Sequence, residues 1–253
     1  MTSPYAFYNA DDPARRASTD MSDAATTTAR WLNAGELPDG LAIELGCGRG
    51  VLASVSDRYT GFDLSFRALA AAAHVRRRVC GDMERLPFRD GSVAFVFSWA
   101  AIEHVPNPER VLAEVERVLR RRGVAVLAPA WHCRPWAAEG LEFRPYRQLR
   151  PGQRVRKALI PLRNSVAWRA LPELGRRALR EIRMRRRAPL PFEYRRLQPS
   201  LAAYFGTDSD AYTDMDPHAM AVYFASRGWD VLSHPTRRAR MAARHEPVVV
   251  RKP

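Results

Sequence analysis

The sequence is poor in cysteine, in lysine and in long apolar runs. Its three cysteines, Cys47, Cys80 and Cys133, are widely spaced and form no CxxC pair, so free thiols in a reducing cytoplasm are the simplest interpretation. No run reaches the ~18 to 20 apolar residues that span a bilayer. The N-terminus has no basic start followed by an apolar core, so no secretory signal is predicted. We therefore expect a cytoplasmic protein.

Lysine is scarce because almost every basic residue is an arginine, and the arginines are unevenly distributed. The chain of 253 residues has 41 basic and 27 acidic residues, a net charge of +14. Residues 132–196 hold 18 basic against 5 acidic residues, which leaves 23 basic and 22 acidic residues elsewhere. A GC-rich genome would explain the preference for arginine over lysine. It would not explain why the charge is concentrated in one segment.

Short apolar runs alternate with helical patterns between residues 20 and 130. VAFVFSW at 93–99 is continuously apolar, as buried strands of parallel sheets are. NPERVLAEVERVLRRRG at 107–123 has apolar residues at helical spacing, with Asn107 expected to cap the helix and Gly123 to end it. The alternation predicts a doubly wound, Rossmann-like α/β sheet with helices on both faces. Its other expected strands are 41–45, 59–63, 77–82 and 124–130, with helices at 20–33 and 65–75.

Composition divides the chain into three parts. Residues 1–20 are polar and are expected to be a flexible N-terminal arm. Residues 21–130 and 217–253 are expected to form the α/β domain, the second piece supplying a helix and two strands. Residues 131–216 are a proline- and arginine-rich, mainly helical insertion, whose expected helices are 153–170 and 172–187.

The stretch ELGCGRG at 44–50 follows the first expected strand and has glycine at alternate positions. Glycine allows a tight turn and close approach to a ligand at the first strand-to-helix connection of such sheets. A dinucleotide fingerprint needs a glycine where Val51 stands, and a P-loop needs a lysine followed by Ser or Thr, which is absent here. Val51 and Leu52 are expected to begin the next helix. The turn alone is compatible with a ligand site and with a plain bend.

Two carboxylates and a longer motif narrow the interpretation. Asp63 ends the second strand 19 residues after Glu44, where it could accept hydrogen bonds from ribose hydroxyls. Asp82 follows the third strand in GDMERLPF, where it could accept a hydrogen bond from an adenine amino group. The alternatives are a strand-end turn residue for Asp63 and a helix cap for Asp82. Together with EHVPNPERVLAEVERVL, these stretches make residues 41–130 resemble class I S-adenosylmethionine-dependent methyltransferases of the methyltransferase 11 type. Residues 214–251 resemble them more loosely.

The resemblance implies a seven-stranded sheet with an antiparallel last strand, and S-adenosylmethionine as cofactor with S-adenosylhomocysteine as product. Glu44, where the family usually has Asp, and the backbone of Gly46 and Gly48 would surround the methionine portion of the cofactor. Cys47 belongs to the same cofactor-binding turn, with its side chain expected to be a small packing residue. Ser98, just after the fourth strand, would lie near the methionine amino group through its backbone.

The same resemblance assigns the adenosine portion to the next two strands. Asp63 would hold the ribose. Asp82 and the backbone of Met83 would bind the adenine, with Leu64 packing on it.

Methyl transfer to a hydroxyl usually needs a general base, and histidine is suited to this role at neutral pH. His104 follows the fourth strand and is the first candidate, although Glu103-His104 could equally be a structural turn. His132 follows the fifth strand. His218, with Asp214, is an alternative acid–base pair beyond the insertion.

A divalent metal is a further alternative at the same edge. In some methyltransferases of this class the stretch reads ExxEH and ligates a metal, but here Ala100 replaces the first glutamate. Glu103, His104 and His132 remain as a conceivable trio of ligands. We do not expect a metal cofactor.

The resemblance to these methyltransferases implies that the basic insertion forms a lid over the acceptor. Arginine clusters bind phosphate, diphosphate or carboxylate groups, anionic membranes or nucleic acid, and a merely solvated arginine surface is the alternative. Arg183, Arg185, Arg186 and Arg187 are expected to act on acceptor binding. The expected acceptor is a small molecule or glycan, anionic or phosphate-linked, with possible contact with the inner face of the membrane.

The reaction expected from these features is O-methylation of a hydroxyl in a glycan, a phosphorylated or carrier-linked molecule, or a specialised metabolite. The alternatives are an N- or C-methyltransferase of a small metabolite, an RNA methyltransferase, and a non-catalytic S-adenosylmethionine-binding protein. Nucleic acid is the less favoured partner, and the oligomeric state is not predicted.

Overall fold

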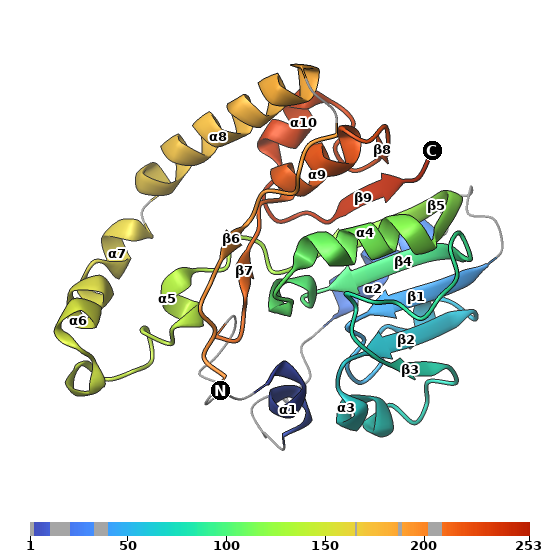
Figure 1. The fold of residues 1–253 in the computed structure, drawn as a ribbon, viewed down its shortest axis with the longest axis horizontal. Coiled ribbons are helices and arrows are strands. Elements are labelled where there is room, and N and C mark those ends of the chain that lie inside the picture. The colour runs from blue at the N-terminus through green and yellow to red at the C-terminus, as the bar shows by residue number, and fades with distance from the viewer. Residues whose placement is uncertain (1–2, 11–20, 33–39, 165, 187–188, 202–208) are drawn as a thin grey trace.

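A seven-stranded sheet forms the centre of the computed structural model, which describes residues 3–10, 21–32, 40–164, 166–186, 189–201 and 209–253 (Figure 1). The strand order is β3-β2-β1-β4-β5-β9-β8. β9 is antiparallel to β5 and β8, and the pairs among the first five strands are parallel. The Rossmann-like sheet with an antiparallel last strand is therefore confirmed. Its strands are β1 Leu41–Leu45, β2 Tyr59–Asp63, β3 Arg78–Cys80, β4 Val93–Trp99, β5 Leu119–Ala128, β8 Asp230–Val231 and β9 Val248–Arg251.

Helices cover both faces of this sheet because successive strand side chains point to opposite sides. Ile43 and Leu45 of β1 pack in one buried cluster with α4 (Pro108–Val118) and α9 (Pro217–Ala225). Ala42 and the aromatic Phe95 and Phe97 pack on the other side with α2 (Ser22–Leu32) and α3 (Phe66–Ala71). Burial on both faces explains why the strands are almost continuously apolar.

The boundaries of α4 differ from the sequence prediction at both ends. Asn107 makes no side-chain cap; its amide instead donates to Glu84, at 3.1 Å to Oε1. The helix ends at Val118 rather than at Gly123, because Leu119 is extended and pairs with Val93 of β4. Gly123 lies inside β5, where a Cβ would be 2.9 Å from the Arg120 carbonyl oxygen. Leu119 is buried here in a strand, and an apolar residue would suit a buried helical position equally well, so its apolar character could not mark the end of the helix.

The helix expected after the glycine turn is replaced by tight turns. Val51 and Leu52 lie in a turn, and Ala53–Val55 form a short 3-10 helix. The amide of Gly50 donates to the Cys47 carbonyl at 2.8 Å, and the amide of Ala53 donates to the Gly50 carbonyl at 3.1 Å. β2 then begins at Tyr59, so turns and the short 3-10 helix make up the connection.

The insertion contains α5 (Pro135–Ala138), α6 (Pro151–Ala158), α7 (Ile160–Arg163) and α8 (Val166–Arg186). The helical segments divide near residues 158–165, whereas the sequence predicted a division near residue 171. The backbone of α8 continues through Pro172 and packs on α9 and α10 (Arg237–Ala242), a helix that was not predicted. β6 (Arg195–Arg196) and β7 (Thr213–Asp214) pair antiparallel, while α6 and α7 lie at the outer edge of the molecule (Figure 1).

The N-terminal segment, expected as a flexible arm, contains the helix α1 (Pro4–Asn9), which contacts α3. Phe7 is buried, and the Asn9 side chain accepts a hydrogen bond from the amide of Arg67 at 3.2 Å. Residues 11–20 of the expected arm lie outside the described residues. Within the part of the chain that is described, no helix has the length and apolarity that a membrane crossing requires.

Candidate cofactor and acceptor site

The glycine turn after β1 has the backbone geometry that only glycine adopts easily. Gly46 and Gly48 have φ of +76° and +52°. A Cβ on Gly46 would lie 2.2 Å from the Cβ of Ala101, so the two segments approach closely. A Cβ on Gly48 would meet no atom within 4 Å. The backbone at Gly48 is therefore bare and borders open space, as a cofactor-binding turn requires.

Asp63 joins the end of β2 to this turn. Its Oδ2 accepts from the amide of Gly48, and its Oδ1 accepts from the amide of Ser65, each at 2.7 Å. Burial raises the pKa of Asp63, while these two hydrogen bonds act in the opposite direction. The carboxylate is thus held at the carboxyl edge of the sheet, where we expect a ribose to bind.

Glu44 and Cys47 lie beneath the turn. The Glu44 carboxylate is buried and accepts a hydrogen bond from the Tyr59 hydroxyl. Burial raises the pKa of Glu44 to about 8, against the opposing effect of that hydrogen bond. Cys47 packs against β2, since a Cβ on Gly61 would lie 2.7 Å from its sulfur. Both side chains support the turn from inside the fold.

The residues expected around adenine lie after β2 and β3. Leu64 and Met83 are half-buried, and Met83 Cε would be 3.7 Å from a Cβ on Gly46. Asp82 is exposed, and its Oδ1 accepts from the amide of Glu84 at 2.9 Å. Residues 83 and 84 lie in a turn, so the helix cap that was the alternative to adenine binding is not formed. The contact with Glu84 uses Oδ1, so Oδ2 of the Asp82 carboxylate can still accept a hydrogen bond from a ligand.

Ser98 lies inside β4, one residue before the strand ends, rather than after it. Its buried hydroxyl donates to the Leu45 carbonyl at 2.9 Å, so its side chain joins β4 to β1. The parallel arrangement thus brings together residues that follow β1, β2 and β3 with the end of β4, as parallel strands dictate.

A cleft of about 450 Å³ opens beside the ends of β4 and β5. The indole N–H of Trp99 donates to the hydroxyl of Thr28 at 2.9 Å, which fixes α2 against this edge. Sequence reasoning did not identify the cleft, because its walls come from four separate segments. They are formed by Met21, Asp23, Ala24, Trp99, Ala100, Ala128, Pro129, Ala130, Trp131 and His245.

Two of the three described non-glycine residues with left-handed backbone lie at the same edge, and the third, Arg122, lies near the start of β5. Ala100 and His132, which follow β4 and β5, have φ of +46° and +61°. Left-handed backbone is unfavourable for residues with a Cβ, and it is concentrated at functional sites in proteins. The two strained residues support the assignment of this edge as a site.

His104 lies in a 3-10 turn between two carboxylates. Its Nε2 is 3.5 Å from Glu103 Oε1, and its Nδ1 is 3.5 Å from Asp210 Oδ1. The Tyr8 hydroxyl donates to Asp210 Oδ2 at 3.0 Å, and the Tyr8 ring meets the His104 ring edge-on, with centroids 6.1 Å apart. The Tyr8 carbonyl also accepts from the hydroxyl of Ser65 at 2.9 Å. The N-terminal helix therefore connects His104 with the residues beside Asp63.

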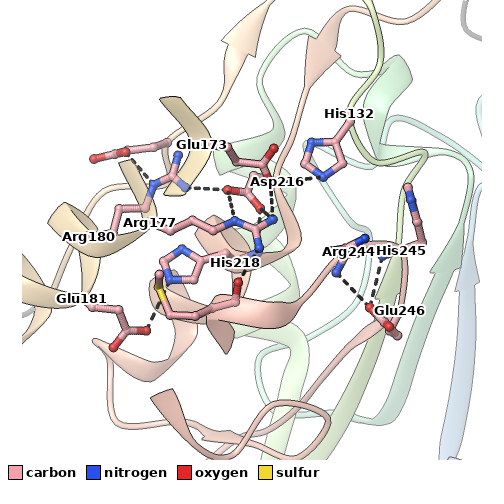
Figure 2. Close-up of polar contacts among 12 residues, drawn as sticks. His132, Glu173, Arg177, Arg180, Glu181, Asp216, His218, Arg244, His245 and Glu246 are labelled. Atoms are coloured by element: carbon pink, nitrogen blue, oxygen red, sulfur yellow. Dashed lines mark hydrogen bonds and ion pairs between the residues drawn. The ribbon is translucent and has the colours of Figure 1, made fainter. Parts of the chain in front are cut away.

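His132 belongs to a different cluster, shown in Figure 2. Among the described residues, the group with metal-ligand spacing is His132, Glu173 and Asp216, whose ligand atoms lie within 4.8 Å of one another. It shares one member with the conceivable trio of Glu103, His104 and His132. Arg177 already contacts both carboxylates, at 2.5 Å to Glu173 and 2.8 Å to Asp216. The Arg177 guanidinium therefore already neutralises the two carboxylates that would have to bind a metal.

His218 is enclosed beneath α8. Its side chain has no exposed surface, and its Nε2 is 3.3 Å from Glu181 Oε1. Burial lowers the pKa of His218 to about 4. Arg240 makes two 2.8 Å hydrogen bonds to the same Glu181. This environment argues against an acid–base role for His218, because no acceptor can reach its ring.

Asp214, which was paired with His218 in the prediction, lies in the small β6–β7 sheet. Burial raises its pKa to about 6, while the positive charge of Arg195, its neighbour across that sheet, has the opposite effect.

The arginines of α8 are partly internal. Arg177 and Arg180 are buried, and both bind Asp216. Arg183 donates to Glu193 at 3.0 Å. Arg185 is exposed, whereas the side chains of Arg186 and Arg187 lie outside the description. The basic charge of α8 therefore serves in part to fasten the insertion to α9, which the charge count alone could not show.

The fold and this edge define a Rossmann-like α/β protein with a glycine turn, an acidic β2 end and an adjacent cleft. A family model described as "Methyltransferase domain" matches residues 43–127, which run from β1 to β5. The chain therefore contains a methyltransferase domain.

Curated relatives agree with this assignment. An uncharacterized methyltransferase of Mycobacterium sp. (strain KMS) is 36% identical over 131 residues, covering 48% of this chain and 52% of its own. A phthiotriol/phenolphthiotriol dimycocerosates methyltransferase of Mycobacterium ulcerans is 37% identical over 129 residues, covering 45% and 47%. The chain thus spans about half the length of these relatives. Among solved structures, a possible histamine N-methyltransferase from Thermotoga maritima is 27% identical with a TM-score of 0.37, covering 43% of this chain and 53% of that one.

Proposed function

We propose that the protein is an S-adenosylmethionine-dependent methyltransferase that methylates a hydroxyl group of an anionic or phosphate-linked small molecule or glycan. The observation that carries the proposal is the bare, left-handed backbone of Gly48 held by the Asp63 carboxylate, within a matched methyltransferase domain. When bound, the cofactor supplies an electrophilic methyl group on a sulfonium. The protein's task is then to align the acceptor and to accept its proton.

Different residues at this edge of the sheet would bind the methionine, ribose and adenine portions of the cofactor. The backbone of Gly46 and Gly48, whose amides are already bound to the Phe62 carbonyl and to Asp63, would line the methionine portion, with the Ser98 backbone beside it. Asp63 would accept from the ribose hydroxyls, in addition to the two amides that it holds. Asp82 and the backbone of Met83 would bind adenine. Glu44 and Cys47 would act from beneath, by shaping the turn.

His104 is our candidate for the base. Its ring is partly exposed, and Asp210 and Glu103 lie 3.5 Å from its two nitrogens, where they would orient the ring. Tyr8 and Asp210 would be positioning residues, since they reach the acceptor only through His104. The cleft lined by Trp99 and Trp131 would hold the acceptor, and basic residues of the insertion would bind its anionic group.

The experiment that tests the proposal has two stages. Calorimetric titration with S-adenosylhomocysteine should show binding at one site per chain, and absence of binding would refute the cofactor assignment. Transfer of a labelled methyl group to a panel of phosphorylated, glycan and lipid-linked hydroxyl acceptors should then identify the class of acceptor. We expect His104→Asn to reduce turnover by about 10² to 10⁴-fold with unchanged S-adenosylhomocysteine affinity. Unchanged turnover would exclude His104 as the base.

A further inference from the structure

The outer part of the insertion, residues 143–163, combines unopposed positive charge with exposed apolar side chains. This segment, which contains α6 and α7, has seven basic residues and no acidic one. Phe143 is 56% exposed, Val155 60% and Leu162 53%. Val155, Leu159 and Leu162 follow one another at intervals of four and three residues, and Leu159 keeps a helical backbone between α6 and α7. They therefore form one apolar stripe along the two helices.

The stripe is exposed although the segment has a small core of its own. Leu149 and Ile160 are buried with Leu141, against Trp136. Arg154 donates to the carbonyls of Tyr146 and Leu149, each at 3.0 Å. These contacts hold the loop before α6 to the helix. The exposed apolar side chains are thus presented on an ordered support, separate from the cleft and from the Asp63 edge.

The cations lie beside the stripe. Arg147, Arg150 and Arg154 are exposed. Lys157 donates to the Arg144 carbonyl at 2.7 Å and lies over the Tyr146 ring, so its charge is held at the same surface. Arg156 is paired with Glu139, which leaves most of the positive charge of the segment without an acidic partner inside it.

We propose that residues 143–163 bind the surface of an anionic lipid bilayer. Such a surface accepts both features at once: aliphatic and aromatic side chains enter the headgroup boundary, and basic residues bind the anionic headgroups. Nucleic acid would be attracted by the cations but would provide no partner for the stripe of Val155, Leu159 and Leu162. The site would hold the protein at the membrane surface, and it acts whether or not the chain is a methyltransferase.

The test is co-sedimentation of the full-length protein with vesicles. Phosphatidylcholine vesicles with ~30% phosphatidylglycerol should bind the protein, and pure phosphatidylcholine vesicles should bind it at least about tenfold more weakly. We expect R147Q/R150Q, which removes two exposed charges and leaves the contacts of Arg154 in place, to weaken binding to the anionic vesicles by about tenfold or more. We expect V155S/L159S/L162S to weaken it at high salt, where the apolar contribution dominates. The matched control R237Q/R238Q removes exposed charge from α10 and should change binding by less than about twofold.

Thermal unfolding of each variant shows whether it is folded, so a lost interaction can be separated from a lost structure. Equal binding to neutral and anionic vesicles, or equal effects of the two arginine variants, would overturn the proposal. Loss of vesicle binding on addition of RNA, together with insensitivity to the serine substitutions, would assign the surface to nucleic acid instead. Because vesicle binding is measured without cofactor, its failure leaves the proposed methyl transfer untouched.

Discussion

Replacing Glu44 by glutamine should make the protein less sensitive to rising pH. Glu44 is 4% exposed and accepts a hydrogen bond from Tyr59. Because burial raises its pKa from 4.5 to about 8, the folded protein retains a proton that the unfolded chain has already released at pH 6 or 7. A raised folded-state pKa contributes stability that is complete below pH 4.5 and is lost as the pH rises through 8. The native Glu44 therefore costs stability in the neutral range.

The magnitude follows from linkage. One bound proton changes the free energy of unfolding by about 1.4 kcal/mol per pH unit, so between pH 5.5 and 7.5 the wild-type protein should lose ~3 kcal/mol through this group. Glutamine mimics the neutral acid, because its carbonyl oxygen can still accept from Tyr59 and it does not titrate. The E44Q variant should therefore gain ~2 to 3 kcal/mol relative to wild type between the two pH values.

Urea unfolding followed by tryptophan fluorescence at pH 5.5, 6.5 and 7.5 measures this difference. Glu142→Gln makes the same substitution at an exposed position of the insertion and is the matched control. If the difference between E44Q and wild type is the same at all three pH values, Glu44 does not carry a proton in the folded state, and the account of its environment is wrong.

Three further predictions concern contacts between distant segments. Asp63→Asn places an amide N–H₂ against one of the two backbone amides that the Asp63 carboxylate binds. It should therefore weaken S-adenosylhomocysteine binding by about 10 to 100-fold, as measured by calorimetry, and the exposed control Asp57→Asn should leave binding unchanged. Tyr8→Phe removes the hydroxyl that binds Asp210, so the amides of residues 5–10 should exchange with solvent faster, as measured by mass spectrometry. Exposed Tyr5→Phe is the control, and equal exchange rates would contradict docking of α1 through this bond. Arg240→Met leaves the buried Glu181 carboxylate without the guanidinium that binds it, and should lower the free energy of unfolding by about 3 to 5 kcal/mol. The double variant R240M/E181Q should recover part of this stability in thermal or urea unfolding, and additive effects of the two substitutions would refute the pairing.

Local patterns in the sequence were enough to predict the central sheet and the turn that follows its first strand. β1, β2 and β4 begin or end where the apolar runs do, because burial on both faces requires continuous apolar residues. The predicted end of α4 was wrong, because the apolar Leu119 suits a buried position equally well in a helix and in a strand. The helix predicted after Val51 was wrong, because the chain forms successive turns and a short 3-10 helix there.

The cleft and the His104 cluster were beyond sequence reasoning for another reason. His104 could be selected by its place after β4, but its partners Tyr8 and Asp210 are about 96 and 106 residues away along the chain, and their contact depends on how α1 and the insertion pack. His132 was selected by the same rule, and packing places it with Glu173 instead. The rule that strand ends converge identifies an edge of the sheet, and it does not identify which side chains meet there.

The sequence by itself determined the α/β class, the glycine turn and the carboxylates at the ends of β2 and β3, because glycine's backbone freedom and strand periodicity are local properties. Only the tertiary structure decided which arginines of the arginine-rich segment are buried in ion pairs and which are exposed to solvent. Arg177 and Arg180 point inward to Asp216, while the 143–163 segment keeps its cations and its apolar stripe at the surface. The physical reason is that an arginine is neutralised by the carboxylate that folding brings to it, and Asp216 is 36 residues or more away in the chain.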